Sequence, residues 1–139
     1  MTKAKTERGV DNGYKNTPKE NQDALVTFFN IMKLWGVDKK AVLVRAILGS
    51  PPSSTYAAWK NGRVGKLPMD TVFRISHVFG IFKDLQILFS DTKAADSWVL
   101  KPNEQFGGQS AIERMAAGQP TDLAEVHYYL DAMRDGYHV

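Results

Sequence analysis

The 139-residue sequence contains no cysteine, and this absence excludes disulfides, thiolate metal ligands and thiol nucleophiles. It also lacks any apolar run near the roughly 18 residues that can span a membrane. The N-terminal stretch MTKAKTERGVDNGYKN has no apolar segment of the kind found in secretory signals. Together these absences predict a cytoplasmic protein.

Patterns that would indicate catalysis are also scarce. The three histidines, His77, His127 and His138, are too widely spaced along the chain to suggest a metal-ligand motif. His77 is interpreted as a residue at the edge of the core without a functional partner. Asp131 and Asp135 are interpreted as surface carboxylates of one helix face, not as a catalytic pair. No stretch has the spacing of a phosphate-binding loop. We therefore expect no metal, no cofactor and no enzymatic activity.

Charges of opposite sign are concentrated in different parts of the chain, although the net charge is only +3. Residues 38–83 contain eight basic and two acidic side chains, a net charge of +6. Residues 84–139 contain nine acidic and four basic side chains, a net charge of −5. The middle of the chain thus suits a polyanion, whereas the C-terminal part suits another kind of partner. Solvated surfaces are the simpler explanation of both clusters.

Helical periodicity dominates after the first 20 residues and predicts an all-α fold. Residues 1–20 are polar and aperiodic, so we expect a mobile tail that ends near Asn21. Apolar residues three and four apart predict a helix from about residue 24 to residue 35. Asp38 is predicted to cap a second helix, in which Val42 continues the apolar positions.

The segment SPPSSTYAAWKNG predicts a short helix over residues 53–61 with two different faces. Ser50 or Ser53 can cap it, and Tyr56 and Trp59 are expected to point into the core. Its outer face and the basic residues at its C-terminal end are the candidate DNA contacts: Ser53, Ser54, Ala57, Ala58, Lys60, Asn61, Arg63 and Lys66.

Residues 35–81 as a whole resemble the helix-turn-helix of the Xre (phage repressor-like) regulators. The resemblance implies a recognition helix that enters the major groove, which is about 12 Å wide. No Arg or Gln lies on the outer face for bidentate base contacts, so we expect weak or cooperative DNA binding. A purely structural three-helix bundle would give the same pattern and is the alternative.

A further helix is predicted after the recognition helix, followed by a very apolar segment. Pro68 fits within its first turn, and Gly80 is expected to end it. Residues 81–89, IFKDLQILF, are then expected to form both a core junction and part of a dimer surface.

A paired glycine precedes a capped helix near the C-terminus. Ser110 and Glu113 have the spacing of a capping box, in which the serine oxygen accepts a backbone N–H and the glutamate reaches back. Gly107 and Gly108 therefore predict a turn into this helix, and Gly118 predicts its end.

The last predicted helix is amphipathic. Thr121 is expected to cap it, and its inner stripe consists of Leu123, Val126, Leu130 and Met133. Tyr128, Tyr129 and Tyr137 add aromatic area, which suits either a protein interface or the completion of the core.

The C-terminal motif resembles the toxin-binding domain of antitoxins of the Xre/MbcA/ParS type. The order W, L-x-P-N, GG-x-S and G carries the resemblance, which covers about residues 24–137 when the helix-turn-helix is included. With the capping glutamate, the residues of this structural motif are Trp98, Leu100, Pro102, Asn103, Phe106, Gly107, Gly108, Ser110, Glu113 and Gly118.

This resemblance implies an antitoxin of a type II toxin–antitoxin system. Such antitoxins are all-helical dimers that bind a RES-domain toxin, an NAD-depleting enzyme, cover its active site and repress their own operon by binding operator DNA. The acidic C-terminal part would suit a toxin pocket that accepts phosphates. The resemblance places the candidate toxin contacts on the last helix and the C-terminus: Tyr128, Asp131, Arg134, Asp135, Tyr137, His138 and Val139.

The predicted organisation therefore has three parts. Residues 1–20 form the tail, residues 21–89 the helix-turn-helix domain with a dimerisation segment, and residues 90–139 the toxin-binding domain. The alternative function is a stand-alone transcription regulator whose C-terminal module dimerises or senses a ligand.

Overall fold

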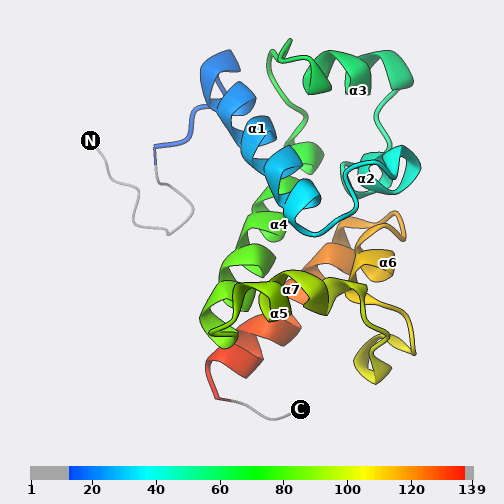
Figure 1. Ribbon diagram of the computed structural model, residues 1–139. Helices are drawn as coiled ribbons and strands as arrows, with labels where there is room; N and C mark the ends of the chain where they lie inside the picture. The colour runs from blue at the N-terminus through cyan, green and yellow to red at the C-terminus, as the bar shows by residue number, and fades with distance from the viewer. Residues whose placement is uncertain (1–12, 137–139) are drawn as a thin grey trace.

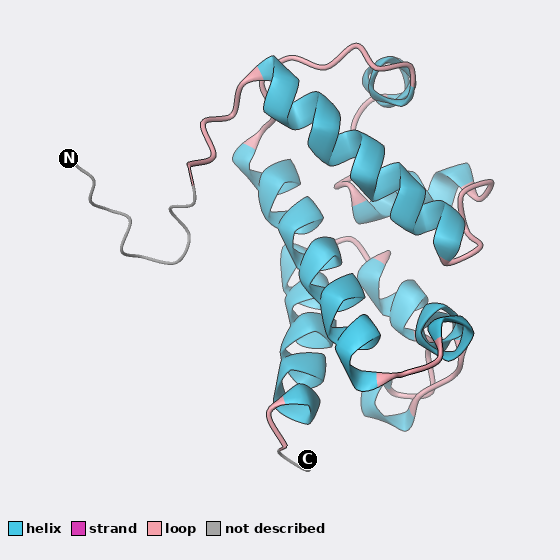
Figure 2. Ribbon diagram, turned by 60° about the vertical axis from the view of Figure 1, so that its left-hand side comes forward, coloured by secondary structure: helices cyan, strands magenta, loops and turns pink. Residues whose placement is uncertain are grey.

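The computed structural model describes residues 13–136, which confirm the predicted all-α fold (Figures 1 and 2). Within this range, the only sheet-like pairing is an isolated antiparallel bridge between Pro102 and Ser110. No helix of this part combines the length and hydrophobicity needed to cross a membrane. The elements are α1 (Pro18–Leu34), α2 (Ala41–Ile47), α3 (Ser53–Lys60), α4 (Met69–Leu88), α5 (Thr92–Ser97), η2 (Trp98–Leu100), η3 (Glu104–Phe106), α6 (Ala111–Met115) and α7 (Pro120–Arg134).

Helix α4 is the central element and belongs to both halves of the molecule (Figure 1). The predicted helix end near Gly80 is wrong, because α4 continues through this residue to Leu88. A glycine inside a helix costs about 1 kcal/mol relative to alanine, which the burial of neighbouring apolar side chains outweighs. Ile81 and Leu85 are fully buried, whereas Ile87 is 54% exposed. The apolar segment after Gly80 therefore contributes mainly to the intramolecular core.

Helices α1, α2 and α3 pack with the first part of α4 to form the N-terminal half. Helix α1 begins at Pro18, before the predicted boundary at Asn21, because Thr17 and Glu20 form a capping box that extends it. The apolar face of α1 is buried in the core through Leu25, Phe28, Ile31 and Met32.

Polar contacts attach the segment before α1 to the loop after α3. Asn21 is buried, and its Nδ2 donates to Gly65 O at 2.9 Å and to Asn16 Oδ1 at 2.6 Å. The Asn16 side chain also pairs with the backbone of Leu67, accepting from its N–H at 3.0 Å and donating to its carbonyl at 3.1 Å. Residues 13–20, which the sequence analysis assigns to the mobile tail, therefore have defined contacts with the N-terminal half.

The first residues of the next helices differ from the predicted ones. Lys40, not Asp38, is the N-cap of α2, and Val42 is 85% exposed instead of facing inward. Pro52 and Pro68 occupy the N-cap positions of α3 and α4, neither of which has a side-chain cap. Proline suits this place because it fixes φ and has no N–H to leave unpaired.

The C-terminal half contains α5 to α7 and lies against the second part of α4. Helix α7 packs along α4, and its predicted inner stripe is confirmed for three residues, while Met133 is 36% exposed. Its predicted cap at Thr121 is wrong, because Gln119 is the N-cap and Pro120 takes the first helical position. The three buried residues of the stripe are Leu123, Val126 and Leu130.

A buried arginine joins the two halves. Arg74 of α4 is 4% exposed, and its Nη2 donates to Gly118 O, beyond α6, at 2.8 Å. Its Nε donates to Asp70 at 2.8 Å, in an ion pair whose carboxylate side chain is 48% exposed. This geometry fixes the turn between α6 and α7 against the N-terminal half.

Candidate functional site

Helix α3 has the two faces predicted for a recognition helix. Tyr56 and Trp59 are each 8% exposed and belong to the core, as predicted. Asn61 is exposed, but its amide Nδ2 donates to Ala57 O at 3.0 Å. One donor of the only side-chain amide on this face is therefore already used within the helix. Of the candidate DNA contacts, Ala58 is half-buried and the following are exposed: Ser53, Ser54, Ala57, Lys60, Asn61, Arg63 and Lys66.

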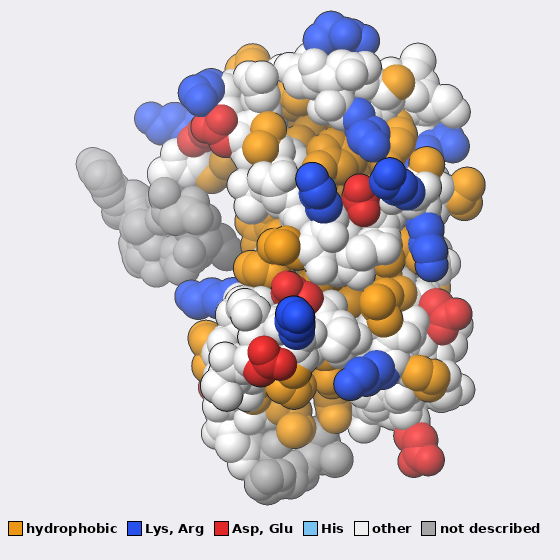
Figure 3. Space-filling model, in the orientation of Figure 1, with side chains coloured by type: hydrophobic (Ala, Val, Ile, Leu, Met, Phe, Trp, Pro, Cys, Tyr) orange, Lys and Arg blue, Asp and Glu red, His pale blue; other side chains and the backbone are white. Residues whose placement is uncertain are grey.

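Basic side chains are frequent on the visible face of this half (Figure 3), although one arginine is buried and another is half-buried. Figure 3 shows Lys and Arg side chains spread over the upper part of the surface, whereas Asp and Glu are more frequent below. Arg74 is buried between the halves, and half-buried Arg45 donates to the Pro51 carbonyl. Arg74 is therefore not available to a polyanion and Arg45 is only partly so, which makes the accessible positive charge of residues 38–83 smaller than their composition indicates.

The paired glycine forms a turn held by backbone contacts. Gly107 and Gly108 both have left-handed φ angles, 67° and 88°. Asn103 closes the turn, because its N–H donates to Gln109 O and its carbonyl accepts from Gly108 N–H, both at 3.0 Å. Its side chain accepts from Gln105 N–H at 2.8 Å. These glycines shape a bend, as the sequence predicts.

The predicted capping box at α6 is confirmed. Ser110 Oγ accepts from Glu113 N–H at 3.2 Å, and Glu113 Oε1 accepts from Ser110 N–H at 2.9 Å. Arg114, in the same helix, donates to the Phe106 carbonyl at 3.2 Å and lies 3.7 Å from Glu125 of α7. The bend is thus connected to both α6 and α7.

The two tyrosines at the middle of α7 have different surroundings. Tyr129 is half-buried and stacks on Trp98, with ring centroids 6.4 Å apart, and it also contacts Phe106 edge-on. Tyr128 is 61% exposed. Tyr129 therefore completes the core, whereas the Tyr128 ring packs against His77 and His127 and leaves most of its surface exposed. The third tyrosine, Tyr137, lies outside the described residues.

The charged residues of α7 do not all face solvent. Arg134 Nη1 donates to buried Asp84 of α4 at 3.0 Å, and its Nε lies 3.5 Å from Asp135. Asp131 Oδ1 lies 3.5 Å from His127 Nε2. Asp131 and Asp135 therefore have different partners and form no carboxylate pair. The candidate contacts His138 and Val139 lie outside the described residues.

A histidine pair joins α4 to α7 and was missed by sequence reasoning. His77 Nδ1 and His127 Nδ1 are 2.9 Å apart, so His77 does have a partner, contrary to the sequence-based interpretation. Fifty positions separate the two residues, and only the packing of α7 on α4 brings them together. Burial lowers the pKa of both imidazoles; the neighbouring His127 adds to the effect on His77, while Asp131 opposes it for both.

Asp84 lies next to this pair at the buried end of the cluster. Burial raises the pKa of Asp84 to about 7, the adjacent Asp131 acts in the same direction, and Arg134 opposes both. The Asp84 side chain is 2% exposed, so its carboxyl group has little contact with solvent.

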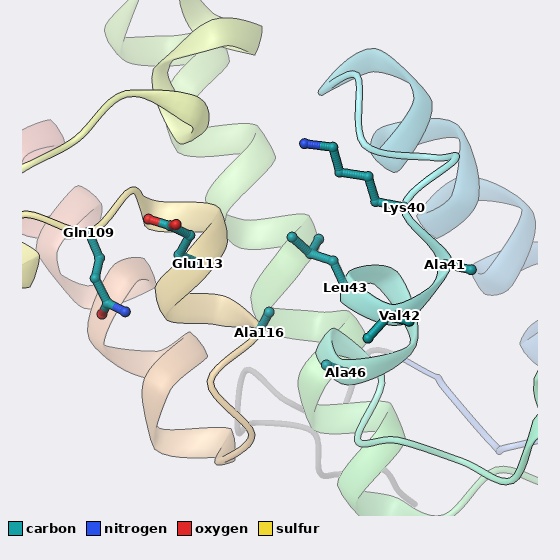
Figure 4. A pocket seen from close by; sticks show the side chains of 8 residues that line it. All are labelled: Lys40, Ala41, Val42, Leu43, Ala46, Gln109, Glu113 and Ala116. Carbon is teal, nitrogen blue, oxygen red and sulfur yellow. The ribbon is translucent and has the colours of Figure 1, made fainter.

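An open groove of about 560 Å³ separates α2 from α6 (Figure 4). One wall is formed by Lys40, Ala41, Val42, Leu43 and Ala46, and the other by Gln109, Glu113 and Ala116. The exposed Val42 belongs to this lining. Both halves thus contribute to one shallow surface depression, which contains none of the candidate DNA or toxin contacts.

Comparison with known proteins identifies the C-terminal half. Residues 84–136 match the family described as the antitoxin Xre/MbcA/ParS C-terminal toxin-binding domain. The chain is also 42% identical over 112 residues to "Uncharacterized protein y4oB" of Sinorhizobium fredii (strain NBRC 101917 / NGR234), covering 81% of this chain and 84% of the relative. The chain belongs to the y4oB family. No solved structure matches it significantly.

The match at residues 84–136 supports an antitoxin role, with a toxin as the partner of this domain. The matched region contains the glycine bend, the capping box and the whole of α7. It also contains Asp84, His127 and Asp131, but it excludes His77 and Gly80 of α4. The toxin-binding domain therefore begins inside a helix whose first part belongs to the N-terminal half.

Proposed function

We propose that this chain is the antitoxin of a type II toxin–antitoxin system, that it neutralises a RES-domain, NAD-depleting toxin by covering its active site, and that it binds operator DNA as a homodimer to regulate its own operon. The observation that carries the proposal is the toxin-binding domain at residues 84–136, whose last helix presents an exposed aromatic residue beside acidic side chains. The family resemblance of the sequence supplies the toxin class.

The toxin contact is centred on the outer side of α7. Tyr128 is 61% exposed, and tyrosine is enriched among the residues that dominate binding energy, because it combines a large contact area with a polar tip. The partly exposed Asp131 and the C-cap residue Asp135 place negative charge on the same helix and at its end. Carboxylates of this kind complement basic residues in a pocket that accepts a dinucleotide.

DNA binding uses the outer face of α3. This face is narrow, with small side chains at Ser54 and Ala57, and Lys60 and Arg63 lie at its C-terminal end for phosphate contacts. Its only side-chain amide is that of Asn61, which already donates to the backbone. Few base contacts are available, so specificity requires a dimer or several bound copies.

Co-expression with the toxin encoded by the neighbouring gene tests the toxin-binding part. The wild-type chain should restore growth, and Tyr128→Ala should weaken binding of the purified toxin by about 2 kcal/mol, or roughly 30-fold. Phe73→Ala is the matched control, because Phe73 is 56% exposed but lies outside the toxin-binding domain. Equal affinities of the two variants would contradict the assignment of α7, and absence of any complex would refute the antitoxin role.

An electrophoretic shift with DNA from upstream of the operon tests the DNA-binding part. Binding should weaken steeply with salt, and the double change Lys60→Gln and Arg63→Gln should reduce the slope of log K against log salt by about 2. A shift without protection from the toxin would favour the stand-alone regulator. Protection without a salt-dependent shift would limit the function to toxin neutralisation.

A further inference from the structure

We propose that Asp84, His127 and Asp131 form a site for a divalent metal ion of the Zn²⁺ class, placed between α4 and α7. Each residue offers one ligand atom, and these three atoms all lie within 4.8 Å of one another. This inference goes beyond toxin and DNA binding, because the chain would bind the metal ion without either partner.

The distances between the candidate ligand atoms fit a metal with small movements. His127 Nε2 lies 3.5 Å from Asp131 Oδ1 and 4.0 Å from Asp84 Oδ2. In a tetrahedral zinc site with bonds of about 2.1 Å, ligand atoms are about 3.4 Å apart. The third pair of atoms, on Asp84 and Asp131, lies within 4.8 Å, so side-chain movements of up to about 1.4 Å would bring the three atoms to this separation. They would then provide three ligands and leave the fourth position open.

Asp84 supplies the observation that points to a ligand. Its side chain is 2% exposed, and Oδ1 accepts from Arg134, but buried Oδ2 has no hydrogen-bond partner within residues 13–136. A buried carboxylate oxygen of this kind is costly unless a proton or a cation compensates it. Oδ2 is directed to the side where His127 and Asp131 lie, so a cation there would meet two further ligands.

His77 sets the proton position on His127 that metal binding requires. Its Nδ1 lies 2.9 Å from Nδ1 of His127, so one of the two nitrogens must carry the hydrogen. When His127 Nδ1–H donates to His77, the lone pair of His127 Nε2 faces the two carboxylates. Metal-bound histidines commonly use the second ring nitrogen in this way, and the contact fixes both the tautomer and the ring orientation.

Gly80 provides the space that the His127 ring occupies. A Cβ atom at this position would lie 2.2 Å from His127 Nε2 and 2.3 Å from Cε1. The ring thus rests directly on the backbone of α4, with its candidate ligand nitrogen at the contact. This close approach accounts for a glycine in the interior of a 20-residue helix.

The ligand set determines the class of metal. One imidazole and two carboxylates suit Zn²⁺ and similar transition metals better than Mg²⁺ or Ca²⁺, which prefer oxygen ligands alone. The side chains of His127 and Asp131 are 20% and 34% exposed, so an ion can enter from solvent and keep a water molecule in the fourth position. A bound ion would link the last helix of the toxin-binding domain to α4.

Metal binding by the full-length, tag-free chain tests the proposal. After dialysis against metal-free buffer, titration calorimetry with Zn²⁺ should show one ion per chain, and Co²⁺ should develop ligand-field absorption. His127→Gln should abolish both signals, and His77→Gln should weaken Zn²⁺ binding about 10- to 100-fold. Glu125→Gln is the matched control, because it removes a carboxylate from the same helix outside the cluster.

Two results would overturn the proposal. One is the absence of saturable Zn²⁺ binding to a chain whose circular dichroism shows that it is folded. The other is Zn²⁺ binding that His127→Gln and Asp84→Asn leave unchanged, which would place the ion elsewhere, for example at His138. Mg²⁺ should produce no saturable heat in the wild-type chain, and binding of Mg²⁺ as tight as that of Zn²⁺ would contradict the imidazole ligand.

Discussion

Replacing Gly80 by alanine should have opposite effects on stability in two backgrounds. In the wild-type chain the new Cβ would lie 2.2 Å from His127 Nε2, which is well inside van der Waals contact. In a His127→Ala chain that ring is absent, and with it the three heavy atoms nearest to the new Cβ. The same substitution therefore tests whether the imidazole occupies the position that the structure assigns to it.

The expected magnitudes follow from two opposing effects. Alanine in place of glycine inside a helix stabilises it by about 1 kcal/mol. Forcing a methyl group into an occupied site costs about 1–3 kcal/mol, including the displacement of the ring from its hydrogen bond with His77. Gly80→Ala should therefore destabilise the wild-type chain by about 1 kcal/mol and stabilise the His127→Ala chain by about 1 kcal/mol. The coupling energy is then about 2 kcal/mol.

Urea denaturation followed by circular dichroism measures the four free energies of unfolding in this cycle. Each kcal/mol should also change the melting temperature by about 4 °C in a domain of this size. Gly65→Ala is the control, because no heavy atom of the described residues 13–136 lies within 4 Å of a Cβ placed there, and its effect should be the same in both backgrounds. An equal effect of Gly80→Ala in both backgrounds would refute the contact between His127 and α4.

Two further stability predictions concern the connections of the C-terminal half. Arg74→Met should destabilise the chain by about 2 kcal/mol, because it removes a charged donor from the Gly118 carbonyl while preserving apolar volume. The control is Arg63→Met at an exposed site, which should change the free energy of unfolding by less than about 0.5 kcal/mol. Ser110→Ala should cost about 1 kcal/mol through loss of the α6 cap, measured by urea denaturation, and an unchanged midpoint would contradict the role of the capping box with Glu113.

The parts of the fold that depend on local sequence were predicted well. The all-α class, the inward direction of Tyr56 and Trp59, and the Ser110–Glu113 capping box all follow from residues at most four apart along the chain. The predicted helix starts were less accurate. Asp38 and Thr121 are favourable N-cap residues, but Lys40 and Gln119 occupy the N-cap positions of α2 and α7. Capping preference is worth only about 1 kcal/mol, so the path of the preceding loop can override it.

The missed features of the candidate site depend on contacts between distant segments. Gly80 resembles a helix end in the sequence, because the ring that explains it belongs to a residue 47 positions later, His127. His77 and Asp84 meet that residue only after α7 packs along α4. The three-residue spacing of His77 and Gly80 was a usable signal for a contact site. If the helix continues through Gly80, this spacing places both residues on one helix face.

Helix α4 explains why the toxin-binding domain begins inside a helix. The matched region starts at Asp84, whose carboxylate binds Arg134 near the end of α7. The buried stripe of α7, which includes Leu123 and Val126, shares one continuous core with Leu85 and its neighbours on α4. The domain therefore cannot bury its last helix without α4, whose first part packs with α1. One continuous helix thus supports both the bundle of α1 to α3 and the surface that carries Tyr128, so an interaction that reorients α4 should move both.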